Sequence, residues 1–478
     1  MDQANFLSQN LSLLLILTVS IAFALIGLIY SKKYQGLNNY LTANRDVGVL
    51  SLTTSLVASA LGAWILFGPA SAATWGGIGS VIGYSLGTAF PMIALIYLGI
   101  KLRSIFPKGK TLTGFIKSRF GKDLFKLILI LTIFYMFIFL CAEVTAVAML
   151  VQYISGTSLW ITAIIVITTT LIYTLYGGLR ASIFTDNIQF FIIILLLLIA
   201  INYLLSFNSD QFSFELIKQN APHLLSTKYI PNYTAGLTFF IAVAATNLFH
   251  QGNWQRVFAA KNNKILKKSL LVSFFIIIPI VFFMGFSGLV AISQNSKINP
   301  DLAFFSILLK DQIEILSIII IVLAVSLTIS TVDTLVNAIS SLVIVDGREA
   351  LKLRPKTNYL KLSRYFIVIL SLISFIIASK GFSILYLFLL ADLFCCAAVF
   401  TVFYGFYNKG FKEKNAFVSI LLGLIFGLLL FPTPNFSNSI LVGILFPVDI
   451  FPALISQSLL FWSFFVATLV PILAWKLR

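Results

Sequence analysis

The apolar runs of this chain are long enough to cross a lipid bilayer. A helix needs about 20 apolar residues to span roughly 30 Å of hydrocarbon. Of the 478 residues, 59% are hydrophobic and only 10% are charged, which would expose far too much apolar surface in a water-soluble domain. We therefore predict an all-α integral membrane protein, a single transmembrane domain over residues 1–478 with about thirteen transmembrane helices. The predicted helices cover 9–30, 50–76, 79–101, 123–154, 160–178, 181–207, 234–256, 269–292, 312–345, 363–379, 382–406, 416–432 and 452–475.

Basic residues are distributed unevenly between the two sides of these helices. With the N-terminus outside, the segments after odd-numbered helices are cytoplasmic, and they hold all of the 33 Lys and Arg residues except Lys218, Lys228, Lys297, Lys310 and Lys380. This bias predicts a multi-pass protein of the cell membrane with its C-terminus in the cytoplasm. The net charge of +17 then reflects topology and contact with anionic lipid. No nucleic-acid partner is expected, because no aromatic-rich basic patch is present in the sequence.

The helices also form two groups of five. Residues 50–207 make the first group and residues 234–406 the second, while 9–30 precedes them and 416–432 and 452–475 follow. Because five is odd, the second group enters the membrane in the opposite sense, which is typical of an inverted repeat. The first helix of each group contains helix breakers or polar residues at mid-depth: Gly62, Gly68 and Pro69, and then Asn247, His250, Gln251, Gly252 and Asn253.

Broken backbone at membrane depth is tolerated where it lines a cavity or is covered by protein. Matched breaks in two inverted groups predict a solute site near the midplane, between halves that rock against each other. The alternative is that these residues are ordinary kinks and helix-packing glycines.

Four acidic residues lie inside predicted helices, away from the helix ends: Glu143, Asp186, Asp333 and Asp392. A carboxylate in hydrocarbon costs at least ~2.5–3.5 kcal/mol unless it is paired or hydrated. We expect no Lys or Arg at comparable depth, so these acids require a cation, a proton or a polar cavity. Arg256 is expected to anchor the inner face, with pairing to an acid of an inner gate as the alternative.

The helix at 312–345 carries a polar stripe. Residues 330, 333, 334, 337 and 341 share one helical face. Hydroxyl, carboxylate and freed carbonyl oxygens are the ligands that a hard cation such as Na+ prefers. The stripe therefore predicts a cation path, with hydrogen bonding between helices as the alternative.

Several segments resemble the sodium:solute symporter family, in the same order and at the same topological places. The resemblance is carried by Tyr176–Gln189 (YGGLRASIFTDNIQ), Ser330–Asp346 (STVDTLVNAISSLVIVD), Gln255–Lys261 (QRVFAAK) and Ala58–Trp64 (ASALGAW). The resemblance implies a LeuT-type fold, with two inverted five-helix repeats, one extra helix before them and two after.

The resemblance also implies that Na+ is the coupling ion. Its ligands would be the main-chain carbonyls of Ala58, Leu61 and Leu327 and the hydroxyls of Ser330 and Thr331. A possible second sodium or proton site would include Asp186, Ser330, Asp333 and Thr334. Asp333 replaces a serine of some relatives, so two nearby acids would hold one ion tightly or share a proton.

The solute cavity should lie between the broken helices and their neighbours. The candidate lining residues are Trp64, Tyr84, Glu143, His250, Gln251, Asn253, Trp254 and Asp392. The alternatives are wall packing for the tryptophans, a hydrogen bond to a neighbouring helix for His250, and a bond to a backbone group for Glu143.

Resemblances within the family also bear on the solute. Asn247–Arg256 and Ala391–Cys396 resemble a branch with fungal and plant urea transporters, whereas Ile65 and Tyr84 replace the polar pair of sugar-transporting relatives. Urea suits a cavity of amides with an aromatic wall. Alternatively, Glu143 and Asp392 would attract a cationic amine or polyamine.

Together these features predict sodium-coupled secondary active symport of a small organic solute, such as urea or another small nitrogenous compound. The alternative is proton-coupled symport of a small solute or of an amino acid such as proline. The partners expected are the solute, the sodium ion and the lipid bilayer. A membrane enzyme is not expected, because only two histidines occur and no nucleophile–base or metal-ligand spacing is found. The sequence does not predict an oligomeric state.

Overall fold

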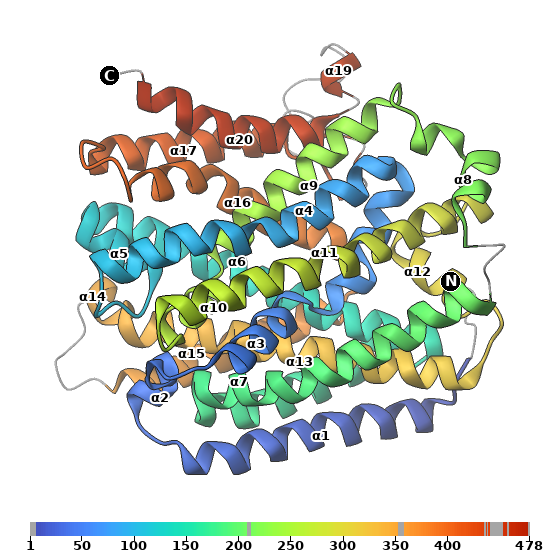
Figure 1. Ribbon diagram of the computed structural model, residues 1–478, viewed down its shortest axis with the longest axis horizontal. Coiled ribbons are helices and arrows are strands. Elements are labelled where there is room, and N and C mark those ends of the chain that lie inside the picture. The colour runs from blue at the N-terminus through green and yellow to red at the C-terminus, as the bar shows by residue number, and fades with distance from the viewer. Residues whose placement is uncertain are drawn as a thin grey trace.

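The protein is almost entirely helical in the computed structural model, as predicted. The structure describes residues 6–207, 212–351, 358–434, 436, 438–439, 453–456 and 458–476. The long helices lie roughly parallel to one another (Figure 1). Among the described residues, nine helices are long and apolar enough to cross a membrane. The chain is thus a multi-pass membrane protein.

The helices occur where the apolar runs predicted them. The long helices are α1 (Gln9–Lys33), α3 (Val49–Ala60), α4 (Gly68–Ile105), α6 (Lys122–Ser155), α7 (Leu159–Phe207), α9 (Ile230–Phe249), α10 (Gln251–Ala259), α11 (Asn263–Gln294), α13 (Glu314–Val345), α15 (Tyr359–Ala378), α16 (Ile384–Tyr404), α17 (Glu413–Leu430) and α20 (Leu459–Lys476). The short helices are α2 (Leu37–Thr42), α5 (Leu112–Arg119), α8 (Phe214–Asn220), α12 (Ala303–Leu308), α14 (Gly347–Leu351) and α19 (Ala453–Ser456). Four 3-10 helices complete them, η1 (Ala43–Arg45), η2 (Ala63–Leu66), η3 (Pro222–Leu225) and η4 (Pro300–Leu302). Part of the last predicted helix, at 452 and 457, lies outside the described residues.

Both predicted helix breaks are present. The segment predicted as 50–76 divides into α3, η2 and the start of α4, and the segment predicted as 234–256 divides into α9 and α10 at His250. The predicted spans 50–76 and 79–101 meet within α4, and 160–178 and 181–207 meet within α7, each pair at one non-helical glycine.

Two glycines allow sharp turns inside the longest helices. Gly77 in α4 has a φ of 61°, and Gly178 in α7 has a φ of 59°. Residues with a Cβ rarely adopt this left-handed conformation. Space is short as well, since a Cβ on Gly77 would lie 2.3 Å from Oδ1 of Asn232. Each glycine therefore turns the chain between two membrane-crossing segments.

The short helices gather at the two ends of the long ones (Figure 1). At one end lie α2, α5 and α14, with Arg45, Lys117, Arg119 and Arg348 on or beside them, and we call this end the basic side. At the other end, the far side, lie α8, α12 and α19. Helix α1 begins on the far side, and α20 ends on the basic side.

Glycines let α4 approach its neighbours backbone to backbone. A Cβ on Gly83 of α4 would lie only 2.0 Å from the carbonyl oxygen of Gly236 in α9, and one on Gly79 would lie 1.7 Å from that of Asn232. On the other flank, a Cβ on Gly288 of α11 would lie 2.0 Å from the carbonyl oxygen of Ala70. Small residues at helix contacts are the usual means of close packing in a membrane.

Substitution of Gly83 with alanine should destabilise the protein. On an uncrowded helix surface, replacing glycine with alanine would raise the free energy of unfolding by up to ~1 kcal/mol. Here the added Cβ would push the backbone of α9 away, which costs about 1–3 kcal/mol. The midpoint of thermal unfolding in detergent should therefore fall. Gly48→Ala is the control, because a Cβ there meets nothing within 4 Å. Equal midpoints for both variants would contradict this account of the contact.

Candidate functional site

The first helix break lies between α3 and η2. The last helical hydrogen bond of α3 runs from the Leu61 amide to the carbonyl of Val57, so the carbonyls from Ala58 onward lie beyond it. On the other side of the break, the Ala63 amide donates to Oε2 of Glu143 at 2.9 Å. Glu143 is fully buried on α6, and its Oε1 has no hydrogen-bond partner among the described residues. Glu143 thus satisfies a backbone group that the break leaves free.

The second break, at His250, is satisfied by its own side chains. The side-chain amide of Asn253 donates to the carbonyl of Asn247 at 2.9 Å, and the indole N–H of Trp254 donates to the carbonyl of Leu248 at 2.7 Å. Nδ1 of His250 accepts from the Gly252 amide at 3.1 Å, at the start of α10. Because the carbonyls of α9 would otherwise be unpaired at mid-depth, these bonds stabilise the break.

A cavity of about 30 Å³ lies between the two breaks. Such a volume holds about one or two water molecules, so the space is nearly closed. Four of the predicted solute residues line it, together with Thr331 of the predicted sodium site: Trp64, Tyr84, His250 and Asp392. Seven further lining residues were not predicted as cavity residues: Ser59, Ala60, Phe139, Val243, Thr246, Asn247 and Phe388.

The other predicted solute residues do not line this cavity. Glu143, Asn253 and Trp254 bind the broken backbone, as described above. Gln251 forms hydrogen bonds toward the basic side. Its side-chain N–H donates to the carbonyl of Lys110 at 3.2 Å, and its side-chain oxygen accepts from the main-chain amide of Leu112 at 3.3 Å. It therefore joins α10 to the segment that leads into α5.

Aromatic rings form two walls of the cavity. Trp64 stacks on Tyr84 with ring centres 5.5 Å apart, and Phe139 meets Phe388 edge to face at 4.7 Å. Asp392 of α16 is 3% exposed, and its Oδ1 has no hydrogen-bond partner within the described chain. The cavity wall therefore contains one carboxylate and several aromatic rings.

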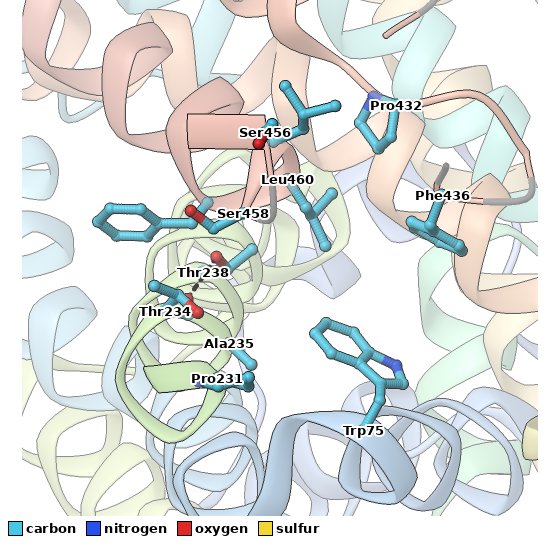
Figure 2. A pocket seen from close by; sticks show the side chains of 12 residues that line it. Trp75, Pro231, Thr234, Ala235, Thr238, Pro432, Phe436, Ser456, Ser458 and Leu460 are labelled. Carbon is cyan, nitrogen blue, oxygen red and sulfur yellow. Dashed lines mark hydrogen bonds between the residues drawn. The ribbon is translucent and has the colours of Figure 1, made fainter. Parts of the chain in front are cut away.

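A larger hollow lies farther along α9, toward the far side. It has a volume of about 240 Å³, and Thr234 and Thr238 of α9 face Trp75 across it (Figure 2). Phe239 packs on Trp75, which lines the hollow, at 5.8 Å, and on Tyr84, which lines the cavity, at 4.9 Å. These three rings thus form a run of aromatic contacts from one space to the other.

A buried ion pair lies on the basic side of the cavity. The guanidinium of Arg256 on α10 contacts Oδ2 of Asp186 on α7 at 2.6 Å, and both side chains are fully buried. The expectation that no Lys or Arg lies at the depth of the acids is therefore wrong for Arg256, and the alternative of an ion pair is the one found. The sequence could not show this, because Arg256 follows the break and its depth depends on how α10 turns.

Hydroxyl groups complete this buried network. Ser330 donates to Oδ1 of Asp186 at 2.6 Å, and Ser55 of α3 donates to Oδ2 at 2.6 Å. Arg256 also donates to Ser55 at 2.8 Å and to Thr334 at 3.0 Å. The guanidinium therefore occupies the space between Asp186 and Thr334, two ligands of the possible second sodium site.

Asp333 lies apart from this guanidinium. It accepts hydrogen bonds from Thr174 at 3.1 Å, Thr185 at 3.3 Å and Asn337 at 2.7 Å. It is fully buried and forms no ion pair with any residue that the structure describes. All three groups that bond to it are neutral.

The predicted sodium ligands fall on two facing elements. Ser330, Thr331 and Leu327 lie on α13, opposite the end of α3 that carries Ala58 and Leu61. The Thr331 hydroxyl is buried and has no hydrogen-bond partner in the described part of the chain. Thr331 lines the cavity together with Ser59 and Ala60. This donor set of neutral oxygens, one of them unpartnered, fits Na+.

Comparison with known proteins identifies related transporters. The model of the sodium:solute symporter family matches residues 40–423. A spermidine transporter of Candida albicans is 27% identical over 424 residues, 86% of this chain and 79% of that protein. The human sodium/myo-inositol cotransporter 2 is 24% identical over 446 residues, 83% of this chain and 66% of the relative. The match thus spans slightly less than two thirds of the myo-inositol cotransporter.

Two solved structures share the architecture. A Na+-coupled sialic acid symporter, substrate-bound and outward-open, matches with a TM-score of 0.71 at 16% identity over 98% of this chain and 97% of its own. A closed nucleobase-cation-symport-1 family transporter matches with a TM-score of 0.56 at 14% identity over 93% of this chain and 95% of its own. At such identities the likeness concerns the fold alone, and it confirms the predicted LeuT-type fold.

Replacement of Arg256 with glutamine should leave Asp186 as a buried charge without its cation. Loss of one partner of such a pair costs about 3–5 kcal/mol of unfolding free energy. The variant carrying both Arg256→Gln and Asp186→Asn should lose less than the sum of the single changes, because neither charge remains alone. Thermal unfolding in detergent measures all three variants. Lys261→Gln, at an exposed pair with Asp46, should change stability by less than about 0.5 kcal/mol. Strictly additive losses would contradict the pairing.

Proposed function

The chain belongs to the sodium:solute symporter family, and on this basis we propose that it carries out sodium-coupled symport of a small nitrogenous solute by alternating access. The observation that carries the proposal is the small cavity between two broken helices, with the unpartnered Thr331 hydroxyl on its wall. Broken helices at mid-depth are where secondary transporters bind both solute and ion.

We propose that Na+ bridges α3 and α13. The carbonyls of Ala58 and Leu61, beyond the last hydrogen bond of α3, would face the carbonyl of Leu327 and the hydroxyls of Ser330 and Thr331. Ser330 donates a hydrogen bond to Asp186, so the lone pairs on the Ser330 oxygen stay free to bind a cation. An ion held by two elements that move apart would couple its own release to the opening of the protein.

Arg256 supports a single sodium ion over two. Its guanidinium already neutralises Asp186 and donates to Thr334, and both would be ligands of a second ion. A second cation there would face like charge within a few ångströms, which costs several kcal/mol at low dielectric. Asp333 remains available to carry a proton.

The nitrogenous class of solute is supported by two observations. The cavity offers polar oxygens and a carboxylate between aromatic walls, which suits small solutes rich in N–H groups. Of the two sequence relatives, the one with the higher identity is named as a spermidine transporter and the other as a sodium/myo-inositol cotransporter. Urea and small amines are therefore the solutes to test first.

We propose that the repeats 50–207 and 234–406 form one domain, in which a block of helices drawn from both repeats rocks against the other helices. The basic side would face the cytoplasm, with the N-terminus outside and the C-terminus inside. Solute would enter through the hollow beyond Phe239 and leave toward α5. On that path, Thr113 of α5 donates to Asp346 at 2.7 Å, and Lys117 pairs with Glu349. These contacts would break when the inner side opens.

The ion gradient supplies enough free energy for accumulation. One sodium ion moving through 100 mV contributes about 2.3 kcal/mol. A tenfold concentration gradient adds about 1.4 kcal/mol. Together they support several-hundred-fold accumulation of a neutral solute, because each 1.4 kcal/mol corresponds to a factor of about ten.

Uptake into proteoliposomes tests the proposed function. The labelled panel would contain urea, putrescine, proline, pantothenate, sialic acid, glucose and myo-inositol, each with and without an inward sodium gradient. We expect sodium-dependent accumulation of urea or of the amine. Accumulation that follows a proton gradient without sodium would overturn the sodium site and assign coupling to Asp333.

Thr331→Val should raise the sodium concentration for half-maximal uptake by about tenfold or more, because it removes a ligand of a cation while keeping the side-chain shape. Thr331→Ser should stay near wild type, since the hydroxyl remains. Thr401→Val is the matched control, because that hydroxyl is also buried and unpartnered but lies on α16, away from the proposed ligands. Unchanged sodium dependence in Thr331→Val would refute the site.

A further inference from the structure

The geometry of the cavity points to a narrower class of solute. We infer that the carboxylate of Asp392 binds a protonated primary amine, so that the transported solute is a small organic cation. This inference rests on the proposed function, because it concerns the same cavity. Three features of the cavity support it: a carboxylate oxygen without a hydrogen-bond partner among the described residues, acceptor groups nearby, and aromatic walls.

Asp392 has no side-chain cation to pair with. Its Oδ1 is buried and has no hydrogen-bond partner among the described residues, although it belongs to a cavity large enough only for a small group. No Lys or Arg is among the described residues that line this cavity. A buried carboxylate without a paired cation is costly, and a cationic solute would compensate it.

Two basic groups near the helix breaks are already engaged elsewhere. His250 lines the cavity, but its Nδ1 accepts a hydrogen bond from the Gly252 amide, which only the uncharged ring can do. Arg256 pairs with Asp186 on the basic side. The negative charge of Asp392 is therefore left for a solute.

Three polar side chains of the cavity offer acceptor oxygens near the carboxylate. Ser59 donates to the carbonyl of Leu56 at 3.3 Å, and Thr246 donates to that of Ala242 at 3.0 Å. Asn247 donates its amide N–H to the carbonyl of Val243 at 3.0 Å. The hydroxyl hydrogens of Ser59 and Thr246 and one N–H of Asn247 are thus bonded to the backbone of their own helices, and the side-chain oxygens can accept. An ammonium group has three donors, which these oxygens and the carboxylate can accept.

The aromatic walls favour the same class of solute. Trp64 and Tyr84 stack on one side, and Phe139 and Phe388 meet edge to face on another. The face of an aromatic ring attracts an organic cation, and the attraction is strongest where water is excluded. A carboxylate in a cavity lined by aromatic rings is thus suited to an alkylammonium head group.

Equilibrium binding to the full-length protein in detergent, at saturating sodium, tests this inference. Labelled ethylammonium is the probe, and acetamide is the uncharged competitor of similar size. We expect ethylammonium to bind, and acetamide to compete about tenfold more weakly or worse, because the ammonium pairs its charge with the carboxylate whereas acetamide offers only an uncharged donor. Equal competition by the two compounds would overturn the inference.

Variants of Asp392 provide the second measurement. Asp392→Asn should weaken ethylammonium binding by about tenfold or more and leave acetamide competition unchanged, whereas Asp392→Glu should keep much of the amine affinity. Glu215→Gln removes an exposed acid of α8 and should bind as wild type. Amine affinity that survives in Asp392→Asn would overturn the assignment. If Asp392→Asn does not fold, the inference is still tested by the competition between ethylammonium and acetamide on the wild-type protein and by ethylammonium binding to Asp392→Glu.

The binding assay separates this inference from the proposed function. Ethylammonium that binds through Asp392 but is not accumulated with a sodium gradient would refute sodium-coupled symport and leave the recognition intact. Sodium-driven accumulation of urea, with no competition from ethylammonium, would refute the amine and leave symport intact.

Discussion

The structure depends on how unpaired backbone groups are satisfied at mid-membrane depth. A continuous helix satisfies its own N–H and C=O groups, and a break exposes several of them where no bulk water is present. At the first break, Glu143 accepts from the Ala63 amide. At the second, Asn253 and Trp254 donate to carbonyls of α9. Each break is therefore held by polar side chains, and the carbonyls that remain free at the end of α3 become available to an ion.

The ion pair of Arg256 and Asp186 connects the elements that surround these breaks. Through Ser55, Ser330 and Thr334 it joins α3, α7, α10 and α13 in one buried network. A buried pair gives little net stability by itself, but loss of one partner is strongly destabilising. The network therefore favours one arrangement of four helices, which is the arrangement that brings the proposed sodium ligands of α3 and α13 face to face.

Much of the fold could be predicted from the sequence, because the length of each apolar run is a local property of the chain. The breaks at Gly62 and His250 could be predicted because helix breakers and polar residues interrupt two of these runs. Side-chain direction could not be predicted: Gln251, Asn253 and Trp254 are polar or aromatic residues at a break, but they turn to the backbone or to the basic side and not to the cavity. Phe139 and Phe388 were missed because an aromatic residue that lines a cavity looks the same in sequence as one that packs against a helix. The network around Arg256 depends on the angle between α9 and α10, which is a tertiary property.

The close contacts of α4 have a consequence for motion. Where a glycine of one helix touches the main chain of the next, as Gly83 touches Gly236 and Gly288 touches Ala70, no flexible side chain lies between them to absorb sliding. Helices α4, α9 and α11 should then move as one rigid block. Bending is left to the short non-helical joints at Leu61–Gly62 and His250, so that α3 and α10 can swing while the block keeps its shape. The residues that bind the ion and the solute would then be the same residues that form the hinges.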